Sequence, residues 1–157
     1  MKPSSHQQNQ QRLNAATRAN WELFQTHRER LGKLLIESCG SRFKSLCVLG
    51  AGNTNDLDLP PLTAQFQRTL LLDLDLAAMQ HGVRQQFGEN TPNSLEIRHA
   101  EVTGSLEVMN ELLSEPTKEP LLQQLTERLS QPRLPITIGE QFDCVVSSCL
   151  LSQLIES

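Results

Sequence analysis

Short apolar runs alternate along the chain with stretches in which apolar residues recur at helical spacing. The apolar runs have the length and composition of buried strands, and they cover residues 45–49, 69–72, 95–99 and 142–148. The helical spacing predicts helices over residues 13–38, 76–87, 106–113, 121–129 and 150–155. Strands that alternate with helices predict an α/β fold, here a Rossmann-like parallel sheet flanked by helices.

The two ends of the chain depart from this alternation. Residues 1–12 are rich in Gln, Asn and Ser and have little apolar surface to bury, so we expect a disordered tail. The next segment, 13–40, is expected to be an N-terminal helix that carries Trp21, the only tryptophan, and packs on the following domain. Residues 41–157 are expected to form a partial cofactor-binding domain, incomplete at the C-terminus, because the sequence stops soon after the fourth strand.

Composition narrows the possible partners and the compartment. The net charge is −4 and the basic residues are scattered, so no nucleic-acid partner is indicated. No apolar run is long enough to cross a bilayer and no signal peptide is evident, which favours a cytoplasmic protein without a membrane partner. The cysteines lack Cys-x-x-Cys spacing, and we interpret them as reduced packing residues rather than metal ligands or disulfide partners.

The first predicted strand runs directly into a glycine turn, Gly50-Ala51-Gly52. Such a turn lets the backbone approach a ligand closely. The next predicted strand leads to Asp73, 21 residues after Gly52, and a carboxylate at a strand tip can accept hydrogen bonds from ribose hydroxyls. Because parallel strands present their carboxyl ends at one edge of a sheet, these residues predict a nucleoside site.

The same landmarks resemble class I S-adenosylmethionine-dependent methyltransferases over about residues 44–155. The segment 48–52 is similar to the family's first motif, Asp73 matches its ribose-binding acid, and Phe142–Ser147 resembles its fourth-strand motif. Glu101 and Val102 fall where family members meet the adenine ring. The resemblance implies S-adenosylmethionine as the cofactor, held by Gly50, Ala51, Gly52, Asp73, Leu74, Glu101 and Val102. It identifies no catalytic base and no methyl acceptor.

The chain also departs from the family pattern. Val48 replaces an acid that often precedes the first glycine, and Thr54 replaces a third glycine. Asp56 and Asp58 are candidates to supply the missing negative charge, with turn capping as the alternative. The missing later strands would leave the fourth strand as an unpaired edge, through which copies of the chain could associate.

Three functions therefore stay open. The first is methyl transfer from S-adenosylmethionine to an unidentified acceptor, carried out by this chain alone or as part of a longer protein. The second is a noncatalytic methyltransferase-like remnant or assembly module. The third is an NAD(P)-binding Rossmann domain. Its fingerprint needs a third glycine where this chain has Asn55, and a helix N-terminus at the turn, which Pro60 and Pro61 delay.

Overall fold

The computed structural model describes residues 5–39, 42–101, 123, 126–127, 130 and 139–147. Its strands are β1 (Ser45–Leu49), β2 (Arg68–Asp73), β3 (Leu95–His99) and β4 (Cys144–Ser147). Its helices are α1 (Ser5–Thr17), the short 3-10 helices η1 (Arg18–Asn20) and η2 (Glu22–Phe24), α2 (Gln25–Cys39), α3 (Leu59–Gln65) and α4 (Leu76–Phe87). The predicted strands agree with these bounds to within two residues.

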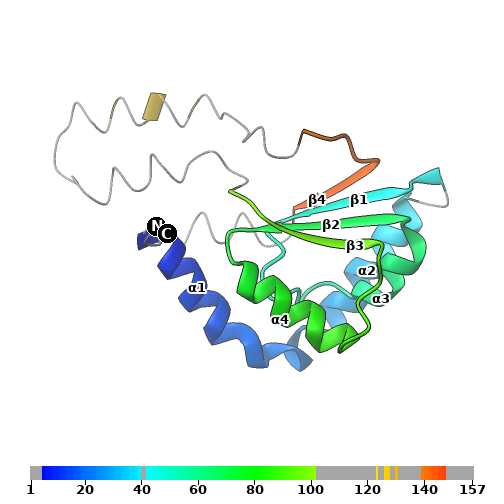
Figure 1. The fold of residues 1–157 in the computed structure, drawn as a ribbon, viewed down its shortest axis with the longest axis horizontal. Coiled ribbons are helices and arrows are strands. Elements are labelled where there is room, and N and C mark those ends of the chain that lie inside the picture. The colour runs from blue at the N-terminus through cyan, green and yellow to red at the C-terminus, as the bar shows by residue number, and fades with distance from the viewer. Residues whose placement is uncertain are drawn as a thin grey trace.

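The strands form one parallel sheet in the order β3-β2-β1-β4, visible in Figure 1. Leu49 at the end of β1 lies beside Leu72 of β2 and Ser147 of β4, so the carboxyl ends of these strands meet at one edge. The Rossmann-like α/β fold predicted from the sequence is confirmed. Among the described strands β4 is terminal in the order, and association of copies through it stays a prediction.

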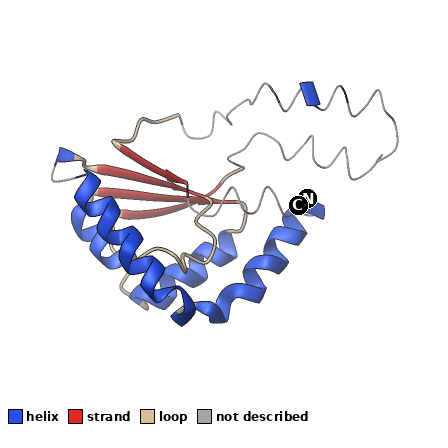
Figure 2. Ribbon diagram, turned by 180° about the vertical axis from the view of Figure 1, so that it is seen from behind, coloured by secondary structure: helices blue, strands red, loops and turns tan. Residues whose placement is uncertain are grey.

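Both ribbon views place α2, α3 and α4 on the same face of the sheet (Figures 1 and 2). Alternate strand residues such as Leu46, Val48 and Leu71 pack there against these helices and are fully buried. Cys47, Leu70 and Leu72 belong to a separate buried cluster. Burial on both faces explains why β1 and β2 are almost continuously apolar, as is typical of parallel strands.

The N-terminal segment differs from the prediction. α1 begins at Ser5, so residues 5–12 are helical where a disordered tail was expected, and η1 and η2 interrupt the single helix expected over 13–40. The side chains of Gln10 and Asn14 are buried although both are amides. The hydrogen bonds of Asn14 attach α1 to the rest of the fold, and a hydropathy pattern does not register such contacts.

Several predictions fall beyond the described residues. The helices expected over 106–113 and 150–155 lie outside them, and of the helix expected over 121–129 only residues 123, 126 and 127 are described, all helical. In the parts of the chain that the structure describes, no helix is both long and apolar enough to span a membrane.

Candidate functional site

The glycine turn is joined directly to the tip of β2. The backbone N–H groups of Gly50 and Ala51 both donate to the carbonyl oxygen of Leu72, at 2.8 and 3.1 Å. One carboxylate oxygen of Asp73 accepts a hydrogen bond from the Gly52 N–H at 2.9 Å. The other accepts one from the Asp75 N–H at 2.8 Å. The predicted proximity of the turn and the acid is therefore present, and the acid itself fixes the turn.

Left-handed backbone explains the residue types in this turn. Gly50 has φ of 72° and Gly52 has φ of 49°, values that glycine adopts without a steric penalty. Thr54 also has a positive φ, 55°, at the position where the resemblance to class I methyltransferases leads one to expect a third glycine. Gln86 of α4 holds this residue, because its side-chain amide donates to the Thr54 hydroxyl at 3.0 Å and to the Leu57 carbonyl at 3.1 Å.

Asp73 sits in an almost closed environment, with only 4% of the residue exposed. Burial raises the pKa of its carboxyl group above the ordinary value, while hydrogen bonds from Asp75 and Gly52 act in the opposite direction. A carboxylate offers about four acceptor positions. The two backbone N–H groups use two of them, which leaves acceptor capacity for a ligand hydroxyl.

α1 packs over the turn through buried amides. The Asn14 side-chain amide donates to the Asp75 carboxylate at 3.1 Å, and the backbone carbonyl oxygen of Asn14 accepts from the Asn53 side-chain amide at 2.6 Å. Asn53 also donates to the Thr17 hydroxyl at 3.2 Å, and Asn55 donates to the Thr17 carbonyl at 2.8 Å. These bonds tie α1 both to the turn and to the segment that follows β2.

Arg28 of α2 supports the turn from the other side. One guanidinium nitrogen donates to the carbonyl oxygens of Trp21 and Asn55, at 2.8 and 2.9 Å. The guanidinium carbon lies 3.4 Å from the centre of the Trp21 ring. This buried cation is committed to two carbonyls and an aromatic face, so it serves to position the turn.

A cavity of about 150 Å³ lies beside the turn. It is lined by Asn14, Thr17, Phe24, Gly50, Ala51, Gly52, Asn53, Thr54, Asn55 and Asp56. Asn53 is 5% exposed and Asn55 is 8% exposed, and the side-chain oxygen of each has no hydrogen-bond partner among the described residues. Their amide orientations are set because both nitrogens donate to carbonyl oxygens. Buried acceptors of this kind call for a donor, from a ligand or from water.

The other residues predicted to contact the cofactor follow β2 and β3. Leu74 is half-buried and directly follows Asp73. Glu101 is half-buried and follows Ala100, whose N–H donates to the Asp73 carbonyl at 3.0 Å. Val102 lies outside the described residues. The structure thus brings Gly50, Ala51, Gly52, Asp73, Leu74 and Ala100–Glu101 to the same edge of the sheet.

The two aspartates that follow the turn take different positions. Asp56 is buried and lines the cavity, as a charge-supplying residue would. Asp58 occupies the N-cap position of α3, yet its side chain makes no capping hydrogen bond. Their role towards a ligand stays a prediction.

The start of α3 is unsuited to a pyrophosphate. The helix begins only at Leu59, whose N–H donates to the Gln86 side chain at 2.8 Å. Pro60 and Pro61 follow and have no N–H. A dinucleotide site of the Rossmann type uses the free N–H groups of the helix after the glycine turn, and this first turn offers none at its first three positions.

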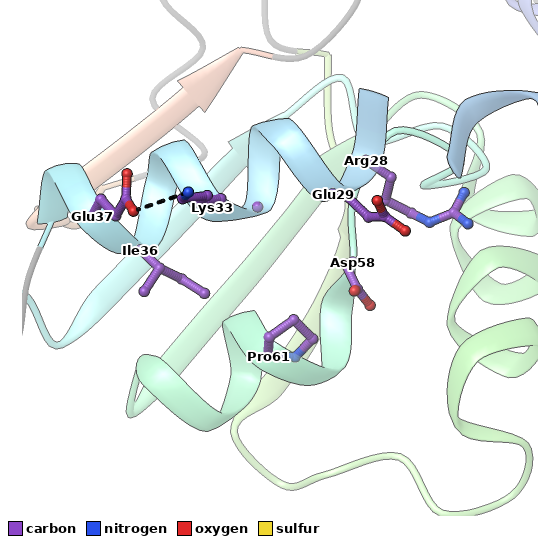
Figure 3. A pocket seen from close by; sticks show the side chains of 8 residues that line it. Arg28, Glu29, Lys33, Ile36, Glu37, Asp58 and Pro61 are labelled. Atoms are coloured by element: carbon purple, nitrogen blue, oxygen red, sulfur yellow. Dashed lines mark ion pairs between the residues drawn. The ribbon is translucent and has the colours of Figure 1, made fainter. Parts of the chain in front are cut away.

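A second hollow of about 380 Å³ lies between α2 and α3 (Figure 3). Ile36 and Pro61 give it an apolar floor, and Lys33 and Glu37 form an exposed ion pair at 3.8 Å on its rim. Among the residues that the structure describes, none of the unpartnered buried polar atoms belongs to the lining of this hollow. The larger hollow therefore lacks the binding groups that mark the smaller cavity at the turn.

Sequence reasoning missed the amides of this site. The sequence pattern does not mark Asn14, Asn53 or Asn55 as binding residues, and Asn55 stands out only because a Rossmann fingerprint would have a glycine there. The sole local signal was the polar run after Gly52, which reads as an ordinary turn. Their burial depends on α1, whose position the sequence pattern did not reveal.

Comparison with known proteins adds no identification. No protein-family model matches the chain, and a search of curated proteins finds no similar one.

Proposed function

We propose that the chain binds S-adenosylmethionine at the glycine turn and contributes to transfer of its methyl group to an unidentified acceptor. The observation that carries this proposal is the Asp73–Gly52 hydrogen bond at the edge of the sheet, beside a cavity with two unpartnered buried amide oxygens. A glycine turn, a strand-tip acid and surplus acceptors together suit a nucleoside with a cationic end.

The charge of the site supports this choice of ligand. Asp56, Asp73 and Asp75 are buried close to the turn, and Arg28 is occupied by carbonyl groups. Fixed negative charge and free acceptors disfavour a phosphate and favour a cation. S-adenosylmethionine carries an ammonium and a sulfonium and has no phosphate, whereas NAD(P) carries a pyrophosphate that the start of α3 does not serve.

Different residues are proposed to bind different parts of S-adenosylmethionine. We assign the ammonium to the side-chain oxygens of Asn53 and Asn55, the ribose hydroxyls to Asp73, and the adenine amino group to Glu101. A cavity of about 150 Å³ is smaller than the roughly 300–1,000 Å³ of whole-ligand pockets. We therefore assign only the amino-acid end to it.

When bound, this cofactor supplies a methyl group already activated by the positively charged sulfur. The chain then has to bind, orient and hold, and positioning alone contributes several kcal/mol to such reactions. The turn is suited to this task because Asp73, Gln86 and Arg28 fix it from three elements. No described residue is assigned as a general base.

Calorimetric titration tests the proposal. The full chain is titrated with S-adenosylhomocysteine and, separately, with NAD. Binding of the first and not the second is the expected result. Binding of NAD alone would establish the Rossmann alternative, and binding of neither would favour the noncatalytic module. Methyl transfer is then assayed with a labelled donor against candidate acceptors.

A further inference from the structure

Two cysteines from distant parts of the sequence meet beside the sheet. Cys39 is the last residue of α2 and Cys144 is the first residue of β4, 105 positions later. Their sulfur atoms lie 3.1 Å apart, and both are free thiols in this structure. This separation is closer than an ordinary contact between two non-bonded sulfurs.

Two independent elements bring these sulfurs together. β4 is held in register beside β1, with Cys144 opposite Leu46. Its preceding residue, Asp143, accepts hydrogen bonds from the backbone N–H groups of Lys44 and Ser45 at 2.8 and 2.9 Å. Cys39 is buried at the end of α2 as part of the main core. The pairing is thus set by regular structure.

We propose that Cys39 and Cys144 are a redox site whose two thiols join in a disulfide bond. The oxidant is a low-molecular-weight disulfide such as oxidised glutathione. Cys144 is half-buried and Cys39 is 7% exposed, so Cys144 reacts first, as the nucleophile that attacks a sulfur atom of oxidised glutathione. Its thiolate displaces one glutathione thiolate and forms a mixed disulfide. Cys39 then displaces the second glutathione. The two protein thiols lose two protons and two electrons, and oxidised glutathione is reduced to two thiols.

The reactivity of the pair follows from its surroundings. Burial, followed by the hydrogen bond with Cys39, raises the pKa of Cys144 to about 12. The thiolate is the attacking species, so the reaction is slow at neutral pH. Its rate rises about tenfold for each unit by which the pH increases, as long as the pH stays below the pKa. The site is accordingly a slow cross-link. It would join α2, which carries Arg28, to the terminal strand of the described sheet.

The test uses the full chain incubated with oxidised glutathione, followed by alkylation and peptide mapping. The expected product has lost two hydrogen atoms and contains a peptide cross-linked between Cys39 and Cys144. Its melting temperature rises by about 6 to 12 °C, because a long loop is closed in the unfolded chain, and dithiothreitol reverses the change. Oxidation at about pH 9 should be faster than at about pH 7.

Matched variants assign the cross-link. Cys39→Ala and Cys144→Ala should each abolish it, whereas Cys47→Ala should retain it, because Cys47 is buried in the separate cluster that also holds Leu70 and Leu72. A glutathione adduct that persists on Cys144, a cross-link to Cys149 or no cross-link in the folded protein would overturn the proposal. Mapping of the unaltered chain keeps the test valid if a variant does not fold.

Discussion

The carboxylate of Asp73 accepts a hydrogen bond from the backbone of Gly52 at 2.9 Å, across 21 residues of sequence. The acid at the tip of β2 therefore shapes the turn that it was expected only to face. If Asp73 binds the ligand as proposed, any substitution of it acts on the turn and on ligand binding together. Stability and binding have to be measured on the same variants.

Asp73→Asn replaces one acceptor oxygen by an NH₂ group that faces a backbone N–H. We expect the free energy of unfolding to fall by about 1 to 3 kcal/mol, because a buried backbone donor loses its partner. Affinity for S-adenosylhomocysteine should fall at least about tenfold, or about 1.4 kcal/mol. Urea unfolding and calorimetry measure the two effects.

Asp58→Asn is the matched control for this change. The Asp58 side chain makes no capping hydrogen bond at the start of α3. The same substitution there should leave the free energy of unfolding almost unchanged, so it is the control for stability. A folded Asp73→Asn variant that binds S-adenosylhomocysteine as tightly as the unaltered chain would remove Asp73 from the site.

Gly82→Ala tests how tightly α4 packs on the turn. A Cβ atom at Gly82 would lie 2.2 Å from the Asn53 carbonyl oxygen and 2.3 Å from the Thr54 hydroxyl. We expect a loss of about 1 to 3 kcal/mol in the free energy of unfolding, as for an overpacked core, and weaker ligand binding. Thermal melts and calorimetry provide the comparison.

Gly32→Ala separates this packing effect from helix propensity. Gly32 is also a helical glycine, but the nearest atom to its added Cβ is 4.0 Å away. This variant should match the unaltered chain or gain up to about 1 kcal/mol from the better helix propensity of alanine. Equal losses for the two variants would contradict the close packing at Gly82.

Asn14→Asp tests the attachment of α1. It would place a second carboxylate against the oxygen of Asp75 that now accepts the Asn14 amide at 3.1 Å. Repulsion should release α1 at neutral pH, and backbone amides of residues 5–17 should exchange hydrogen faster. Asn9→Asp is the control, because an Asp there can still accept the bond from Arg12. Unchanged exchange in the Asn14 variant would argue against this attachment.

Acid should weaken the attachment of β4 to β1. Hydrogen bonds from the Lys44 backbone and from Ser45 lower the pKa of Asp143 below its ordinary value of 3.8. The stabilisation is therefore complete above that value and is lost as the pH falls through the lower pKa of the folded protein. Urea unfolding of the unaltered chain and Asp143→Asn should differ at pH 7 and converge towards pH 2. A constant difference would refute the charge effect.

Asp73 should show the opposite pH dependence. Its pKa is raised in the folded protein, chiefly by burial. Its contribution to stability is thus fullest below 3.8 and declines as the pH rises through the higher folded value. The difference in unfolding free energy between the unaltered chain and Asp73→Asn should shrink across this window in urea titrations. A difference that grows with pH would show that the hydrogen bonds outweigh burial.

The apolar strands and the glycine turn could be predicted because they depend on local sequence. The bounds of β1 and β3 agree with the prediction, and the glycine turn meets Asp73 because parallel strands end at one edge. The contacts of Asn14 and the pairing of Cys39 with Cys144 were not readable. Each depends on partners dozens of residues away in the sequence. A hydropathy pattern does not predict that an amide or a single cysteine is buried.

Trp21, the only tryptophan of the chain, lies where its fluorescence can report on the glycine turn. Trp21 stacks against Arg28, and the same guanidinium holds the carbonyl of Asn55 beside the cavity. Movement of the turn would shift this cation relative to the ring and change the emission of the fluorophore. The protein thus contains a label-free reporter whose signal arises from the neighbourhood where a ligand would bind.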